Sequence, residues 1–210
     1  MRRIVYKPVP DEATPRPADI AQRRFTAIRP SASWVVDLTD VATSGGIFRD
    51  MMIHDFDVAR WFLGEEPVEV FAWGSCLVSP MFAELADADT AMAMLKTASG
   101  RLCQIENSRR AVYGYDQRIE VFGSKGMLQA GNRTETTTEL WNETGIVRDK
   151  ILPFFPERYV EAYAAEIAAF LDAVTQGKSP EVGAVAGQLS LVLADAATRS
   201  FKTGQPVKIG

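Results

Sequence analysis

The sequence predicts an α+β fold in which an open-faced, mostly antiparallel sheet carries helices on one face. Three observations predict it. A helical apolar pattern begins near residue 45, apolar residues then alternate along the middle of the chain, and the helical period returns after Pro156. The 210 residues are 47% hydrophobic and 24% charged, as in an ordinary globular protein. We expect an irregular leader over residues 1–44 and one folded domain over residues 45–210.

The leader differs in composition from the rest of the chain. It holds five of the eleven prolines and no glycine. Proline fixes φ and lacks an N–H donor, so most of this stretch cannot continue a regular helix or a central strand. A short helix over residues 20–28 and one strand over residues 34–38 are compatible with the pattern.

A helix is predicted over residues 46–63. Apolar residues surround most of this segment, and Gly64 follows it as a residue type that commonly ends helices. His54, the only histidine of the chain, lies here four positions after Asp50. Because a helix turns about 100° per residue, the two side chains fall on one stripe, which Asp57 and Trp61 share.

The spacing of Asp50 and His54 is typical of a proton-transfer pair. An imidazole beside a carboxylate can move a proton near neutral pH. A structural hydrogen-bonded pair is the alternative that the spacing allows. Asp57 on the same stripe faces either a substrate or water. No metal site is expected, since one imidazole and two carboxylates on one helix have no further visible ligand. The chain also lacks the Gly-x-Ser-x-Gly motif of a serine hydrolase.

The middle of the chain predicts a series of antiparallel strands. They are expected over residues 68–78, 90–96, 101–107, 118–123, 126–130 and 136–141. Ser99-Gly100 and Ser124-Lys125 are suited to tight turns between neighbouring strands. Short connections of this kind join antiparallel strands, whereas parallel strands need long crossovers.

Two further helices are predicted over residues 159–174 and 185–201, each followed closely by a glycine. With helices on one face, the second face of the sheet needs another cover. Its apolar content is indicated by Met92, Met94, Val121 and Leu140. We therefore expect a homodimer or tetramer that packs these open faces together.

Charge and hydropathy exclude several classes of partner. The formal charge of -4 and the absence of Lys/Arg runs argue against nucleic acid and membrane surfaces. No apolar run reaches the roughly 18 residues of a membrane span, and the N-terminus lacks the apolar core of a secretory signal. A cytoplasmic location is expected. Cys76 and Cys103 lie in predicted strands without nearby ligands, so we expect reduced thiols.

Several motifs in one order resemble a known family over about residues 44–210. The motifs are the segment Gly45 to Gly64 (Gly-Gly-Ile-Phe-Arg-Asp-Met-Met-Ile-His-Asp-Phe-Asp-Val-Ala-Arg-Trp-Phe-Leu-Gly), Pro67-Val-Glu-Val, Tyr113-Gly-Tyr-Asp-Gln-Arg118, Val121-Phe-Gly-Ser-Lys-Gly-Met-Leu128 and Thr203-Gly-Gln-Pro-Val207. Together they resemble the C-terminal domain of the Gfo/Idh/MocA oxidoreductases, and within that family the chain looks most like inositol 2-dehydrogenase.

The resemblance implies a function and a set of site residues. Family members join an N-terminal Rossmann domain that binds NAD or NADP to a C-terminal domain with an antiparallel sheet. They oxidise a ring hydroxyl of a cyclitol or sugar to a ketone. By this similarity Asp50 and His54 match the family's catalytic helix. Tyr115 matches a position that lines the polyol site, with Tyr113 and Asp57 as further candidate contacts to the substrate.

The chain departs from the family at its N-terminus. A dinucleotide fold needs a glycine-rich turn after its first strand, and no glycine precedes Gly45. We therefore expect the Rossmann domain to be missing, so that the isolated chain binds neither NAD nor NADP and is inactive. A truncated gene, a shifted reading frame and an excised domain each account for such a leader. A non-catalytic dimerisation or polyol-binding domain is the alternative function.

Lys7 is not assigned a role. The segment Tyr6-Lys7-Pro8 is similar to the family's Glu-Lys-Pro, whose lysine assists catalysis, but tyrosine replaces the glutamate. The interval from Lys7 to Asp50 is also shorter than in a complete member of the family.

Overall fold

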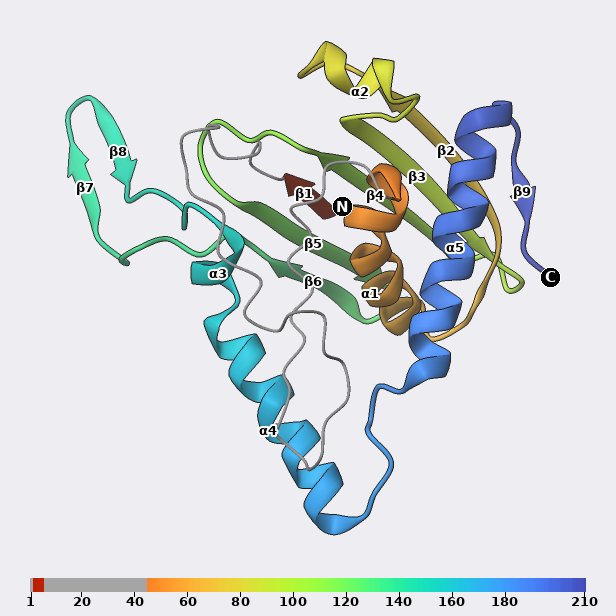
Figure 1. Ribbon diagram of the computed structural model, residues 1–210. Coiled ribbons are helices and arrows are strands. Elements are labelled where there is room, and N and C mark those ends of the chain that lie inside the picture. Colours follow the sequence, from red (N-terminus) through yellow and green to blue (C-terminus); the bar gives the residue numbers. More distant parts are fainter. Residues whose placement is uncertain (1, 6–44) are drawn as a thin grey trace, which may run out of the picture.

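The computed structural model describes residues 2–5 and 45–210 and shows helices packed on one face of a large sheet (Figure 1). In chain order the elements are β1 (Arg2–Val5), the π-helix η1 (Phe48–Met52), α1 (Ile53–Leu63), β2 (Pro67–Ser75), α2 (Pro80–Glu84), β3 (Thr90–Thr97), β4 (Leu102–Ser108), β5 (Asp116–Gly123), β6 (Gly126–Ala130), β7 (Glu139–Asn142), β8 (Gly145–Arg148), α3 (Phe155–Arg158), α4 (Val160–Gln176), α5 (Ala184–Thr203) and β9 (Val207–Lys208).

The large sheet has the order β6-β5-β1-β4-β3-β2-β9. Its strand pairs are antiparallel, except that β1 runs parallel to β4. The predicted α+β class and the open, mostly antiparallel sheet are therefore confirmed. The alternation of apolar residues was sufficient for this prediction because the strands β2, β3 and β4 each have one face toward the helices.

Strand β1 lies between β4 and β5, where Val5 is in register with both Ser108 and Asp116. The sequence predicted an irregular leader over residues 1–44, whereas residues 2–5 of that segment form a strand. A strand in this position satisfies backbone groups of both neighbours, which would otherwise face each other across a gap. The helix expected over residues 20–28 and the strand expected over residues 34–38 lie outside the described residues.

The covered face of the sheet carries small side chains. Ala91, Ala93 and Leu95 on β3 are buried, on the face over which α1 and α5 lie side by side in Figure 1. Gly74 on β2 allows the closest approach, because a Cβ there would lie 2.7 Å from the Cβ of Ala88 and 2.9 Å from the ring of Phe201. Small residues thus let α5 pack directly on the sheet.

The opposite face of the sheet is open and partly apolar. Trp73 pairs with Met92 and Phe71 with Met94 across β2 and β3, and the rings of Phe71 and Trp73 lie 4.0 Å apart. Met92 and Met94 thus lie on the open face as predicted. Two other predicted members do not: the register places Val121 on the face of Asn107, toward the helices, and Leu140 belongs to a separate hairpin.

Two segments depart from the prediction of one sheet with its helices. The strand predicted over residues 136–141 is wrong in its pairing: β7 pairs only with β8, in a two-stranded sheet that projects from the body (Figure 1). The α4 helix has the predicted apolar stripe but none of its residues is buried, and it extends away from the large sheet in Figure 1. Periodicity shows which side of an element is apolar, but not what covers it.

The helix predicted over residues 46–63 is present and has two parts. Phe48–Met52 form the π-helix η1, and α1 continues from Ile53 to Leu63. Gly64 then adopts the left-handed conformation, with φ 62°, and donates its N–H to the carbonyl of Arg60. This is the C-cap that the glycine predicted.

Candidate active site

His54 lies on the exposed side of α1, beside a buried carboxylate. Asp55 is 0% exposed, and it accepts a hydrogen bond of 2.8 Å from Nδ2 of Asn107 on β4. This bond fixes the first turn of α1 against the sheet. His54, the preceding residue, is therefore held at a defined place on the surface of the helix.

Asp50 lies in the π-helical turn and pairs with an arginine that the sequence analysis missed. Its Oδ2 accepts a hydrogen bond of 2.7 Å from Nη1 of Arg109, and the two side chains are 13% and 9% exposed. The interval of four residues to His54 lies between the α-helical period of 3.6 and the longer π-helical period. This spacing still predicts that Asp50 and His54 share one side of the helix.

Asp87 holds the start of the π-helical turn. Its Oδ1 accepts the backbone N–H of Ile47 at 3.0 Å. Gly46 has φ +70°, and a Cβ there would lie 2.8 Å from the same oxygen. Glycine is therefore needed at this position for both its conformation and its close approach to the carboxylate. Oδ2 of Asp87 lies 3.6 Å from Nη2 of Arg109, so one guanidinium faces two carboxylates.

Asp89 supports the same corner of the fold. Burial opposes ionisation of Asp89, but backbone N–H groups of Ser79, Leu77 and Val78 donate to its carboxylate and lower its pKa. The carbonyl of Asp89 accepts the N–H of Arg109 at 2.8 Å. The backbone at Arg109 is thus tied to the end of the loop between α2 and β3, and the carboxylate of Asp89 holds the segment ahead of α2.

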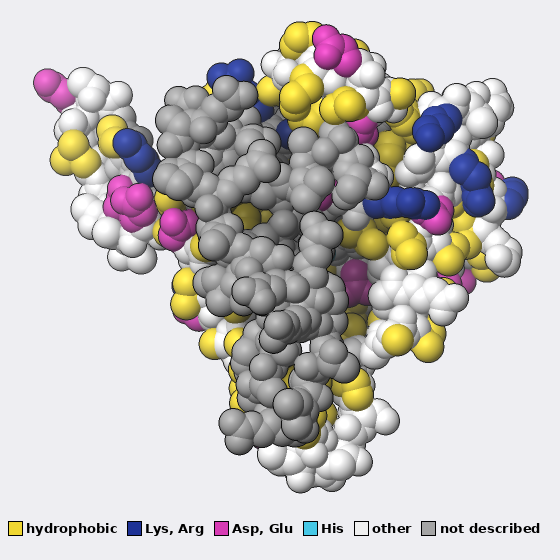
Figure 2. Space-filling model, in the orientation of Figure 1, with side chains coloured by type: hydrophobic (Ala, Val, Ile, Leu, Met, Phe, Trp, Pro, Cys, Tyr) yellow, Lys and Arg dark blue, Asp and Glu magenta, His cyan; other side chains and the backbone are white. Residues whose placement is uncertain are grey.

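Figure 2 shows the outer side of this corner, where apolar side chains gather over α2. Leu77, Met81 and Leu85 are 77%, 40% and 48% exposed. Phe82 on the same helix is buried, and the guanidinium of Arg109 lies 5.1 Å from the centre of its ring. The short helix α2 therefore covers the guanidinium of Arg109 with an aromatic ring.

The sheet register brings Tyr115 to the same end of the sheet as Arg109. Arg109 follows Ser108 at the end of β4, and Tyr115 precedes Asp116 at the start of β5. Both Ser108 and Asp116 are in register with Val5 of β1. Tyr115 itself is 7% exposed, so its ring forms part of the wall at this end of the sheet.

The rings and hydroxyls near Tyr115 are engaged with their neighbours. The ring of Tyr115 meets that of Tyr159 edge-on, with centres 5.7 Å apart. The hydroxyl of Tyr113 donates to Oδ2 of Asp116 at 2.5 Å. Tyr113 was predicted as a possible substrate contact, and in the structure its hydroxyl also holds the start of β5.

Asp116 organises the turn that carries both tyrosines. The residue is 0% exposed. Burial opposes its ionisation, but hydrogen bonds from Arg118, Tyr113 and Asn132 outweigh this effect and lower its pKa. The carboxylate therefore acts as an ionised anchor between β5 and the segment after β6.

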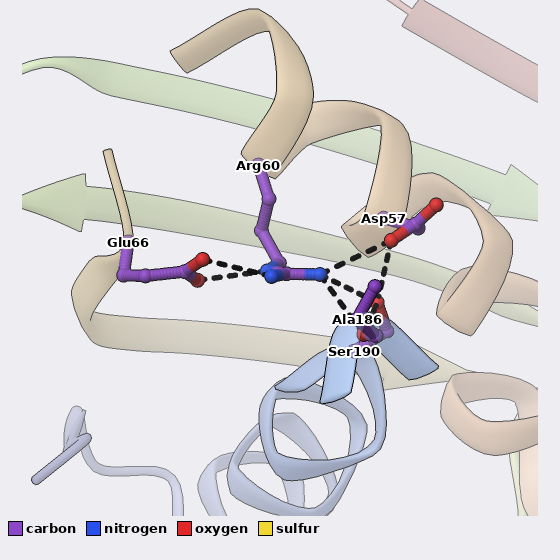
Figure 3. A network of polar contacts seen from close by, with 5 residues as sticks. All are labelled: Asp57, Arg60, Glu66, Ala186 and Ser190. Carbon is purple, nitrogen blue, oxygen red and sulfur yellow. Dashed lines mark hydrogen bonds and ion pairs between the residues drawn. The ribbon is translucent and has the colours of Figure 1, made fainter. Parts of the chain in front are cut away.

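Asp57 takes part in a different network, on the side of α1 that faces α5 (Figure 3). Its Oδ1 accepts hydrogen bonds from Nη1 of Arg60 and from the hydroxyl of Ser190, both at 3.1 Å. Arg60 also donates to both carboxylate oxygens of Glu66 and to the carbonyl of Ala186. These contacts join α1, the loop before β2 and α5, so they give Asp57 a structural role.

Other kinds of site find no support in the described part of the chain. Residues 2–5 and 45–210 contain no group of three or more histidine, cysteine or acidic side chains placed to hold a metal ion. Cys76 and Cys103 are not joined to each other, and Sγ of Cys76 donates to the carbonyl of Asp87 at 3.1 Å. None of the described helices has the length and hydropathy to cross a membrane.

The supporting residues were harder to predict than the candidate pair. Arg109 belongs to Ser108-Arg109-Arg110, which follows a predicted strand and resembles a solvated turn. Asp87 and Asp89 lie in a polar stretch with no helical or strand period. The one available signal was the position of these charges directly before or after strands, where loops often carry functional groups.

Comparison with known protein families identifies a match to residues 17–129. The matching family is the GFO/IDH/MocA C-terminal domain. Among curated proteins, the myo-inositol 2-dehydrogenase of Thermotoga maritima is 49% identical over 80% of this chain and 51% of its own length. The inositol 2-dehydrogenase of Rhizobium meliloti is 46% identical over 80% of this chain and 51% of its own length.

Solved structures agree with the sequence comparison. A probable dehydrogenase from Thermotoga maritima superposes with a TM-score of 0.78 at 42% identity, covering 99% of this chain and 56% of that chain. The scyllo-inositol dehydrogenase of Lactobacillus casei, solved with NAD(H) and scyllo-inositol, has a TM-score of 0.73 at 31% identity, covering 80% of this chain and 49% of that chain. The chain thus spans about half the length of these relatives.

Proposed function

The chain belongs to the GFO/IDH/MocA oxidoreductase family as an inositol dehydrogenase-like C-terminal domain, and from this premise we propose that residues 45–210 form the substrate-binding and proton-transfer part of an NAD(P)-dependent cyclitol dehydrogenase. The observation that carries the proposal is the position of the turn with Asp50 and His54, which Arg109 ties to the end of the sheet where Tyr115 lies. The domain assignment, with residues 1–44 as a leader, is part of the proposal.

The proposed chemistry is the oxidation of a secondary ring hydroxyl. One ring nitrogen of His54 takes the hydroxyl proton, which helps the carbon to release hydride. Asp50, four residues before His54, is the group proposed to orient the imidazole and stabilise the protonated ring, while Arg109 donates to its Oδ2. Tyr115 contributes the wall against which the ring of the polyol lies. Tyr113 and Asp57 are the further candidate contacts to the substrate, and each also has a structural partner, Asp116 and Arg60 respectively.

The hydride acceptor is not supplied by the described residues. A dinucleotide site requires a parallel layer with a glycine-rich turn ahead of a helix. In residues 2–5 and 45–210 the only parallel pair is β1 with β4, and the first glycine of the chain is Gly45. The described residues therefore do not fit NAD or NADP. We propose that the isolated chain is inactive until a nucleotide-binding domain is supplied.

Isothermal titration of the intact chain tests this division of the site. We expect no heat of binding with NAD or NADP and a weak signal with myo-inositol or scyllo-inositol. Binding of NAD tighter than about millimolar would overturn the proposal that the acceptor site lies elsewhere. Cyclitol binding that is equal in the wild type and in Tyr115→Ala would remove the assignment of the polyol wall.

A second candidate function rests on the open face of the sheet. Trp73, Met94 and Leu102 are 55%, 45% and 67% exposed there. Two copies that pack these faces together would bury an apolar surface that a monomer seldom leaves in water. On this proposal the chain forms a homodimer or tetramer. It would then serve as a dimerisation domain even if it catalyses no reaction.

A further inference from the structure

The strongest unassigned feature of the site is the buried guanidinium of Arg109. Its side chain is 9% exposed, its backbone N–H is held by the carbonyl of Asp89, and the ring of Phe82 covers it on one side. A guanidinium so enclosed has little freedom to change its rotamer. The guanidinium of Arg109 therefore restricts the positions of the groups that it contacts.

Arg109 reaches the π-helical turn at two points. Nη1 donates to Asp50 at 2.7 Å, and Nη2 lies 3.6 Å from Asp87, whose other oxygen holds the N–H of Ile47. The first point holds a side chain of the turn, and the second holds the backbone where the turn begins. The planar fork of a guanidinium can face two carboxylates at once, whereas a lysine ammonium acts as a single point charge.

The position of His54 depends on both ends of this segment. Asp55 is anchored to Asn107 of β4 on one side, while Asp50 is anchored to Arg109 on the other. A π-helical turn is a strained insertion that persists where its surroundings hold it. Loss of the anchor at Asp50 would free this turn to relax toward the α-helical period and would rotate Asp50 relative to His54.

We propose that Arg109 is a positioning residue that holds the π-helical turn, and with it Asp50, in the geometry that orients the imidazole of His54. This inference rests on the proposed function for the meaning of that geometry. The geometry itself can be measured without any substrate, since His54 is the only histidine of the chain and gives one set of imidazole signals.

The test is heteronuclear NMR of the histidine ring in the full 210-residue chain labelled with ¹⁵N and ¹³C. Wild type is compared with Asp50→Asn, Arg109→Gln and Arg109→Lys. The matched control is Arg110→Gln, which removes the neighbouring and exposed arginine. We expect Arg109→Gln to shift the ring ¹⁵N signals of His54 in the same direction as Asp50→Asn and by a comparable amount. Arg110→Gln should leave them in place.

Substitution by lysine distinguishes the effect of the planar guanidinium, which can contact two carboxylates, from the effect of its positive charge. Arg109→Lys keeps a positive charge and should restore the wild-type ring signals only in part. Asp87→Asn provides a second variant should Arg109→Gln fail to fold, and it should shift the signals less than Asp50→Asn does. Folded Arg109 and Asp87 variants whose ring signals match the wild type, while Asp50→Asn shifts them, would overturn the inference. Failure to bind a cyclitol would count against the proposed function and would leave this result standing.

Discussion

Oδ2 of Asp50 lies 2.7 Å from Nη1 of Arg109, and this contact joins the helix that carries the only histidine to the loop after β4. Both side chains are largely buried. Removal of one partner from a buried ion pair leaves an uncompensated charge in a medium of low dielectric constant. The pair therefore has consequences for stability as well as for the site.

The first prediction concerns the stability of this pair. Arg109→Met should lower the free energy of unfolding by about 3 kcal/mol, because Asp50 and Asp87 then keep buried charges without their partner. Urea unfolding followed by circular dichroism measures the change. Arg49→Met is the matched control, since the pair of Arg49 with Asp195 is exposed and its loss should cost much less. An equal loss of unfolding free energy in Arg109→Met and Arg49→Met would show that burial of the Arg109–Asp50 pair does not add to stability.

The second prediction concerns the network around Arg60. Arg60→Met should destabilise the chain by about 2 kcal/mol, because Asp57 and Ser190 lose a charged donor at the contact between α1 and α5. The change is measured by denaturant unfolding. Arg133→Met serves as control, because Arg133 pairs with Glu161 in the open. A stability of Arg60→Met equal to that of the control would contradict the structural role given to Asp57.

The third prediction concerns acid stability and Asp116. Hydrogen bonds lower the pKa of Asp116 below its ordinary value of 3.8 despite burial. Its contribution to stability is therefore complete above that value and is lost as the pH falls through the lower pKa of the folded state. Unfolding free energies measured between neutral pH and about pH 2 should fall less steeply in Asp116→Asn than in wild type. Asp172→Asn, on the exposed helix α4, should keep the wild-type slope. If the unfolding free energy of Asp116→Asn depends on pH as steeply as that of wild type, ionised Asp116 does not contribute to stability in this way.

The fourth prediction concerns the open face of the sheet. Light scattering coupled to size exclusion should give wild type a mass above the 23.1 kDa of one chain. Met94→Lys places a charge in the middle of the proposed contact and should shift the protein to the monomer. Val185→Lys, at a more exposed apolar position at the start of α5, should leave the assembly intact. A wild-type monomer at micromolar concentration would contradict the dimer proposal.

The sequence predicted most of the fold because the periodicities of its elements are strong. Thr90–Thr97 alternates between covered and open faces, as its pattern of alanines and methionines required. Gly64, Gly177 and Gly204 end their helices in the left-handed conformation. The signals for these elements are local, so tertiary contacts were not needed to recognise them.

The remaining features depend on contacts between distant segments. Strand β1 is four residues long, and its place is set by its pairing with β4 and β5 rather than by its own pattern. The partner of Asp50 is 59 positions away in sequence. The predicted helical stripe grouped Asp50 and His54 with Asp57, which the fold directs toward α5. Local spacing does not distinguish two sides of one helix that meet different neighbours.

The central claim is that this chain holds the proton-transfer half of a redox site. It is tested most directly by fusing the chain to the nucleotide-binding half of the Thermotoga maritima relative and following the reduction of NAD by myo-inositol. We predict that the fusion is active and that His54→Ala lowers its kcat by about 10²- to 10⁴-fold, while Asp57→Asn has a small effect. A folded fusion that binds NAD but does not oxidise the cyclitol, or a His54→Ala variant as active as the parent, would contradict the account.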